Sequence, residues 1–132
     1  GNLMALFRDN GASKSLFRAF STDSGRSWST PVQTDFPDAR SKLHGLRMSD
    51  GRYALVSNSN PKKRDPLTLA LSRDGMTFDR LFYVVGGRHV DYPHMIEHGG
   101  YLYIAHSGAK MSVEIERVRI ADLDRLSMPA GR

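Results

Sequence analysis

A chain of 132 residues has room for one ordinary domain, and its 39% hydrophobic and 25% charged residues are typical of a folded globular protein rather than a disordered one. The absence of cysteine excludes disulfides and thiolate metal sites, and no apolar run approaches the roughly 18 residues that a membrane-spanning helix needs. The net charge of +5 favours anionic partners. An acidic sugar is a sharper candidate than nucleic acid, because no nucleic-acid-binding module surrounds the scattered basic residues.

The chain reads as consecutive short strands separated by turns, which we expect at residues 3–8, 16–21, 44–48, 53–57, 67–71, 81–85, 92–97, 101–106 and 113–120. A further apolar strand edge lies near Val32, and residues 34–42 read as a polar connection. The dipeptides Asp50-Gly51 and Gly99-Gly100 are typical of hairpin turns. Helix signals are confined to the end of the chain, near residues 121–126.

Two stretches of the chain share a turn motif. Residues 21–28 read Ser-Thr-Asp-Ser-Gly-Arg-Ser-Trp, and residues 72–78 repeat the pattern with one residue fewer and with Phe in place of Trp. In such a turn the Asp side chain accepts hydrogen bonds from the backbone amides that follow it, and the Gly takes a positive φ without a Cβ penalty. We expect the rings of Trp28 and Phe78 to anchor each turn onto the sheet beneath it. The interval of 51 residues between the two stretches indicates a repeat architecture.

This motif resembles the Asp-box, or BNR repeat, of the sialidase-like β-propellers. The resemblance implies an all-β fold made of β-propeller blades, with one nearly complete four-stranded blade at residues 43–87 and incomplete blades at residues 1–36 and 88–121. A propeller needs about four blades to close, so residues 1–132 are expected to be a single incomplete propeller region of two to three blades. We expect the missing blades to come from elsewhere in a larger protein or from another chain, or the fragment to self-associate, because open sheet edges attract partners.

Three segments resemble functional segments of the sialidases in order and approximate spacing: residues 2–8, 60–72 and 90–96. The resemblance implies that Arg8 and Arg64 are the second and third arginines of a carboxylate-binding triad, and that Tyr92 is the catalytic tyrosine. Each residue also has a purely structural interpretation. Arg8 can be a salt-bridged surface arginine, Arg64 can belong to a solvated basic loop, and Tyr92 can be a packed strand tyrosine.

The chemistry of an acidic sugar explains these residue types. Guanidinium groups bind carboxylates through planar forks and keep their charge at all physiological pH values. A sialic acid carries its carboxylate on the anomeric carbon, so a charged nucleophile would be repelled there. A neutral phenol avoids this repulsion, and sialidases are the known case of a tyrosine nucleophile among glycosidases.

The resemblance also implies what this chain lacks. The catalytic Glu, the acid/base Asp and the first arginine of the family would precede the strand that ends in Arg8, so the chain alone is expected to be inactive. Tyr92 is followed by Pro93-His94 rather than by the serine usual in well-characterised sialidases. No cofactor, metal or membrane partner is expected, and the resemblance suggests a secreted or periplasmic protein.

The five histidines suggest a second function. His94 would share a strand face with Tyr92, and a His-Tyr pair beside arginines suits a polysaccharide lyase or rhamnosidase that acts on glycans containing uronic acids. A metal site is not expected, because His94 and His98 lie too far apart along a strand to bind one ion. A non-enzymatic carbohydrate-binding propeller is the third interpretation, because Asp-boxes are structural and also occur in binding proteins.

Overall fold

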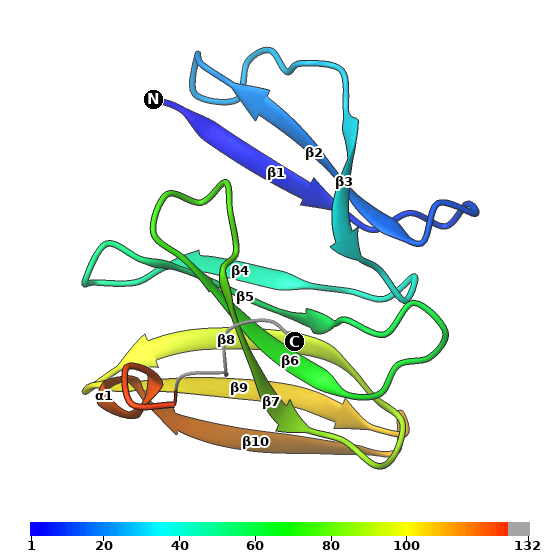
Figure 1. Cartoon of the computed structure of the whole chain (residues 1–132), viewed down its shortest axis with the longest axis vertical. Coiled ribbons are helices and arrows are strands. Elements are labelled where there is room, and N and C mark those ends of the chain that lie inside the picture. The colour runs from blue at the N-terminus through cyan, green and yellow to red at the C-terminus, as the bar shows by residue number, and fades with distance from the viewer. Residues whose placement is uncertain (127–132) are drawn as a thin grey trace.

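The computed structural model describes residues 1–126, which form ten β-strands and one short helix (Figure 1). The strands are β1 (Leu3–Phe7), β2 (Ser15–Ser21), β3 (Val32–Pro37), β4 (His44–Arg47), β5 (Tyr53–Asn58), β6 (Leu67–Ser72), β7 (Arg80–Val85), β8 (Val90–His98), β9 (Tyr101–Gly108) and β10 (Ser112–Arg119), and the helix is α1 (Ile120–Leu123). The strands predicted from the sequence are present, with ends that differ by at most two residues. No helix within residues 1–126 has the length and apolar character that a membrane crossing requires.

The strands form three antiparallel sheets, in the orders β1-β2-β3, β4-β5-β6-β7 and β8-β9-β10, which lie one after another along the long axis of the molecule (Figure 1). Within each sheet, every strand pairs with the next one in sequence, so every sheet is a simple meander. The predicted turn between β8 and β9 is confirmed, since His98 pairs with Tyr101 across two residues. Those residues, Gly99 and Gly100, have φ values of +56° and +82°, which suit a tight hairpin turn.

The sequence predicted a polar connection at residues 34–42. This prediction is wrong for its first part, because β3 extends to Pro37. The hydroxyl of Thr34 donates a hydrogen bond to the carbonyl of Leu16 (2.7 Å), and the ring of Phe36 packs edge-on against that of Phe78. A register shift between β2 and β3 interrupts the alternation of apolar and polar residues along this segment. Because the alternation is interrupted, periodicity alone does not predict a strand at these residues.

The first Asp-box has the predicted turn geometry. The carboxylate of Asp23 accepts hydrogen bonds from the backbone N–H of Ser27 (2.9 Å) and from the hydroxyls of Ser27 (2.6 Å) and Ser21 (2.8 Å). These bonds, those from Ser27 first, lower the pKa of Asp23 to about 2. Gly25 takes a φ of +88°, as the turn requires.

The second Asp-box repeats this arrangement between β6 and β7. Asp74 Oδ1 accepts from the backbone N–H groups of Met76 (2.8 Å) and Thr77 (3.0 Å), and Gly75 has a φ of +77°. Each box lies just before the last strand of its sheet. The correspondence between the two sheets is therefore β1 with β5, β2 with β6 and β3 with β7. The first two sheets are therefore copies of one repeat.

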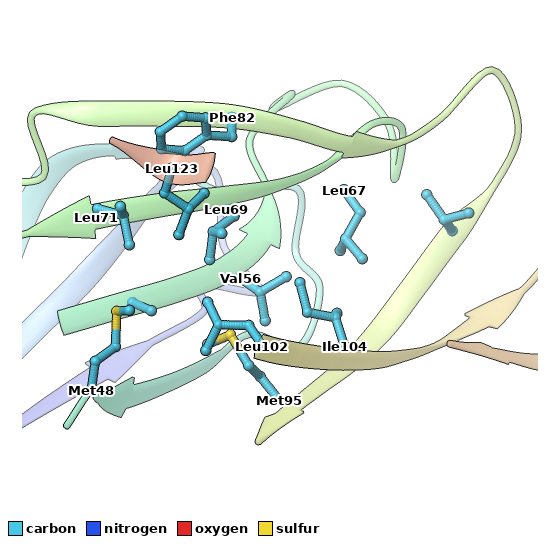
Figure 2. Close-up of a cluster of buried hydrophobic side chains, with 12 residues drawn as sticks. Met48, Val56, Leu67, Leu69, Leu71, Phe82, Met95, Leu102, Ile104 and Leu123 are labelled. Atoms are coloured by element: carbon cyan, nitrogen blue, oxygen red, sulfur yellow. The ribbon is translucent and has the colours of Figure 1, made fainter. Parts of the chain in front are cut away.

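The main core lies between the second and third sheets. Figure 2 shows that side chains from β5 and β6 meet side chains from β8 and β9, with Leu123 of α1 beside Phe82 at one end. Its buried members are Met48, Ala54, Val56, Leu67, Leu69, Leu71, Phe82, Val90, Met95, Leu102, Ile104 and Leu123. Burial of one such leucine stabilises a fold by roughly 1.5–3 kcal/mol, so this cluster joins the two sheets into one unit.

A smaller cluster joins the first sheet to the second. Leu16, Leu55 and Ala70 are its buried members, and Phe78 of the second Asp-box packs against it. Phe78 therefore anchors its turn on the sheet, as predicted. The same prediction is wrong for Trp28, because this residue remains 45% exposed. Within residues 1–126, the indole N–H of Trp28 donates to the carbonyl of Gly25 (3.1 Å) and to no other group. The physical reason is position: Phe78 faces the first sheet, whereas the equivalent Trp28 lies on the outer sheet of the stack.

Candidate functional site

The meanders place the loops that follow β1, β3, β5, β7 and β9 at one end of all three sheets, on the right of Figure 1. The two Asp-box turns lie at the opposite end. The loop end carries a concentration of basic residues: Arg8, Lys14, Arg40, Lys42, Lys62, Lys63, Arg64, Arg88 and Lys110. An electropositive end of this kind attracts anions, and two of the predicted site residues lie there side by side.

Arg64 lies in the loop between β5 and β6, and two acceptors hold its guanidinium. Nη1 donates to Oδ2 of Asp91 (2.9 Å), and Nη2 donates to the backbone carbonyl of Arg40 (2.7 Å). The carbonyl of Arg64 accepts from the N–H of Val90 (3.0 Å), which ties the loop to the start of β8. A guanidinium has five N–H donors, so Arg64 is fixed in place and still has donors to offer a ligand.

Asp91 is the buried counter-charge of this site. Its side chain is 0% exposed, and Oδ2 also meets Nε2 of His89 at 2.9 Å, while Oδ1 has no hydrogen-bond partner within residues 1–126. Burial raises the pKa of Asp91, but the hydrogen bonds from Arg64 and His89 outweigh this effect and bring it below the usual value. The carboxylate is therefore ionised and holds Arg64 beside β8.

Tyr92 stands outside the strand pairing. A bulge separates Asp91 from His94 in the pairing of β8 with β9, and Tyr92 within it has a φ of +54°. That left-handed conformation is costly for a bulky residue and is typical of functional sites. It leaves the tyrosine side chain 40% exposed while Asp91, immediately before it, is buried. The structural interpretation of Tyr92 as a packed strand residue does not describe this geometry.

Three cations surround the ring of Tyr92. The ammonium of Lys110 lies 5.3 Å from the ring centroid, the guanidinium carbon of Arg64 5.7 Å and the ammonium of Lys42 6.0 Å. Hydrogen bonding to Arg64 and then to Lys110 lowers the pKa of the Tyr92 phenol. The cations therefore make the phenol easier to deprotonate, as a nucleophile or base requires.

The backbone around this site is strained in several loops. Of the six non-glycine residues with positive φ within residues 1–126, four lie here: Arg40, Tyr92, Ala109 and Lys110. The N–H of Ala109 donates to the carbonyl of His89 (2.9 Å), and that of Lys110 donates to the hydroxyl of Ser107 (2.8 Å). These bonds fix the β9–β10 turn, so Lys110 is presented to Tyr92 by an ordered turn rather than by a free side chain alone.

Arg8 is placed differently. It follows β1, is exposed, and its guanidinium makes no hydrogen bond or ion pair within residues 1–126. Its neighbour Asp9 is connected to the site through the backbone: the N–H of Asp9 donates to Oδ2 of Asp38 (2.7 Å), whose Oδ1 accepts from the N–H of Arg40 (2.9 Å). The loops thus bring Arg8 to the same end as Arg64, while contact is limited to the pair Arg64 and Tyr92.

His94 is exposed on β8 and stacks on His44 of β4, with ring centroids 4.1 Å apart. Nδ1 of His44 accepts from the backbone N–H of Met95 (3.2 Å). Burial, and then the charge of His94, lower the pKa of His44. No cluster of three metal-ligating side chains occurs in residues 1–126.

The sequence reasoning missed four residues around the site: Lys42, His44, Asp91 and Lys110. Only Asp91 carried a usable signal, since an acidic residue at the apolar start of a strand requires a partner when it is buried. The other three reach the site from loops or strands that only the packing of the sheets brings together.

Residues 1–104 match the family model described as the BNR repeat-like domain. The chain belongs to that family. Proteins with BNR repeats include sialidases and other glycan-acting propellers, and the three sheets are blades of this all-β propeller architecture. A search of curated proteins found no match to the chain.

Proposed function

We propose that this BNR-repeat chain forms part of a sialidase-like glycoside hydrolase that acts on terminal acidic sugars of glycans. One observation carries the proposal: the exposed phenol of Tyr92 lies beside the guanidinium of Arg64, which a buried carboxylate, Asp91, holds in place. Arg64 binds the carboxylate of the sugar, with Arg8 contributing from the neighbouring loop. Tyr92 supplies the reacting oxygen.

In the proposed reaction, Oη of Tyr92 attacks the anomeric carbon as the glycosidic C–O bond breaks. The phenol proton passes to a base, and the leaving oxygen takes a proton from an acid. By the family resemblance both groups lie in sequence that precedes β1. Within this chain, the cations around Tyr92 make the phenol a better nucleophile, and Arg64 offsets the negative charge next to the reacting carbon.

A lyase or rhamnosidase is the second candidate, and the stacked imidazoles of His44 and His94 favour it. His94 lies two residues from Tyr92, and burial followed by the charge of His94 lowers the pKa of His44, which favours the neutral form that a proton acceptor requires. The third candidate is a carbohydrate-binding propeller without activity, in which the same cations bind an acidic glycan.

The test is binding and turnover by matched variants. In the chain alone, Arg64→Gln is expected to weaken binding of a carboxylated sugar about tenfold or more, since a charge-assisted hydrogen bond contributes roughly 1.5–3 kcal/mol. Lys62→Gln, which removes one charge from the same loop, is the control. In a polypeptide that supplies further blades, Tyr92→Phe is expected to abolish turnover of an aryl sialoside with little loss of binding.

The outcomes separate the three candidates. Full activity of Tyr92→Phe together with an inactive His94→Ala variant would replace the hydrolase with the lyase or rhamnosidase, and an aryl uronide is the second substrate to assay. Binding without turnover of either substrate would favour the carbohydrate-binding propeller.

The proposal includes partners for the two outer blade faces. Leu3, Phe7 and Trp28 are 44–46% exposed on the first sheet, and Val113 and Ile115 are 83% and 66% exposed on the third. Exposed apolar side chains at the two ends of the stack suit packing against further blades or a second copy of the chain. Light scattering over a concentration series tests this, and a compact monomer at all concentrations would contradict it.

A further inference from the structure

The positive charge around Tyr92 is larger than the binding of a single ligand carboxylate requires. Three cations lie within about 6 Å of the ring centroid, contributed by Arg64, Lys42 and Lys110. The carboxylate of Asp91 is shared between Arg64 and His89 and balances at most one of them. Within residues 1–126, at least two positive charges therefore have no ion-pair partner at one exposed tyrosine, although like charges repel one another at this range.

The two lysines have no acidic partner among the residues that the structure describes. Neither Lys42 nor Lys110 forms an ion pair within residues 1–126. The nearest acidic residue on β10, Glu114, is already bound by both terminal nitrogens of Arg88, at 2.6 and 2.8 Å. Water solvates these exposed ammonium groups, and the field of the two cations attracts an external anion to this point.

The lysines are also held in position by their loops. Lys110 lies in the strained β9–β10 turn that is bonded to His89 and Ser107. Lys42 follows Ser41, whose buried hydroxyl donates to the side chain of Asn58 (2.8 Å). Cations from three separate loops thus converge on one ring, which distinguishes this group from lysines scattered over a surface.

We infer that the site takes a ligand with two anionic groups: a carboxylate at Arg64 and a second group, sulfate or carboxylate, at Lys110 and Lys42. The substrate class is then an acidic sugar with a second negative charge, on the same ring or on the adjoining sugar. This inference rests on the proposed function and narrows its substrate class.

The experiment measures binding to the chain by calorimetry with three probes. They are methyl glucuronide, which has one carboxylate, the same sugar with one sulfate, and a diuronide. We expect each dianion to bind about tenfold or more tightly than the monoanion, with a steeper loss of affinity as salt is added. The sulfated sugar and the diuronide distinguish the two sources of the second charge.

Lys110→Gln is the decisive variant. It is expected to remove the preference for dianions while changing monoanion binding less than about twofold, and Lys110→Arg should restore the preference because it keeps the charge. Lys62→Gln is the control and should alter neither affinity. Both lysines are exposed, and unchanged unfolding curves would show that the variants remain folded.

The results also separate this inference from the proposed function. Equal affinity for monoanion and dianions, or an equal loss of both in Lys110→Gln, would overturn the two-anion site while monoanion binding through Arg64 still supports the acidic-sugar site. Failure of the folded chain to bind any of the three probes would overturn the two-anion site, and failure to bind a methyl sialoside as well would overturn the proposed function.

Discussion

Replacing Asp91 with asparagine tests whether a buried carboxylate organises the site. The substitution keeps the size of the side chain and removes its charge. Asp91 is 0% exposed and receives Arg64 and His89 on one oxygen, each at 2.9 Å. The variant therefore leaves Arg64 without its counter-charge at the point where the loop after β5 meets the start of β8.

The expected loss of stability in Asp91→Asn depends on how exposed the two partners of Asp91, Arg64 and His89, are. Removal of one member of a buried ion pair costs roughly 3–5 kcal/mol. Here the Arg64 side chain is 20% exposed and the His89 side chain 46%, so both regain hydration, and the amide oxygen of asparagine can still accept one hydrogen bond. We therefore expect the free energy of unfolding to fall by about 2 kcal/mol at neutral pH.

The assay is urea unfolding of four proteins: wild type, Asp91→Asn, Arg64→Gln and the double variant. The double-mutant cycle is expected to give a coupling energy of about 1–2 kcal/mol between the two residues. Because folding lowers the pKa of Asp91, its contribution is present above about pH 4 and is lost as the pH falls through the folded-state pKa. The difference between wild type and Asp91→Asn should therefore shrink on acidification. Additive effects, or a loss below about 0.5 kcal/mol at pH 7, would refute the reasoning.

Three further predictions concern the blades and the tyrosine. Trp28→Ala is expected to cost about 2 kcal/mol, below the roughly 3–5 kcal/mol of a buried aromatic residue, because the ring is 45% exposed; a loss above 4 kcal/mol in urea unfolding would show that the ring is covered. Leu102→Ala, at 0% exposure between the second and third sheets, is expected to cost about 2–5 kcal/mol by the same measurement, and a loss below 1 kcal/mol would contradict the described core. The phenol of Tyr92 is expected to titrate below the usual tyrosine pKa in a nuclear magnetic resonance pH series, and Lys110→Gln should shift that pKa upwards. An unchanged titration in the variant would show that Lys110 does not act on the phenol.

Much of the fold could be predicted from local sequence. Alternation of apolar and polar residues predicted the strands, and the positions of Asp23 and Gly25 predicted the geometry of the first Asp-box, because a turn depends on a few consecutive residues. The exception is β3, where a register shift breaks the alternation. Exposure of Trp28 could not be predicted either, since it depends on which sheet lies next to the turn.

Less of the candidate site could be predicted. The family resemblance singled out Arg64 and Tyr92, which are 28 positions apart in the sequence and lie side by side in the structure. The resemblance did not identify Asp91 as the residue that holds Arg64 beside Tyr92. It also did not identify Lys110 as a second cation near the ring of Tyr92. Those assignments need the bulge in β8 and the strained β9–β10 turn, which arise when the strands are paired.

The sequence by itself determined the all-β class, the two Asp-box turns and the types of residue suited to an acidic sugar, because each depends on a short stretch of chain. Tertiary structure alone decided which of the basic residues lie close together. Charges interact through space over a few ångströms, and only the stacking of three meanders brings Lys42, Arg64 and Lys110, from three different loops, around the ring of Tyr92.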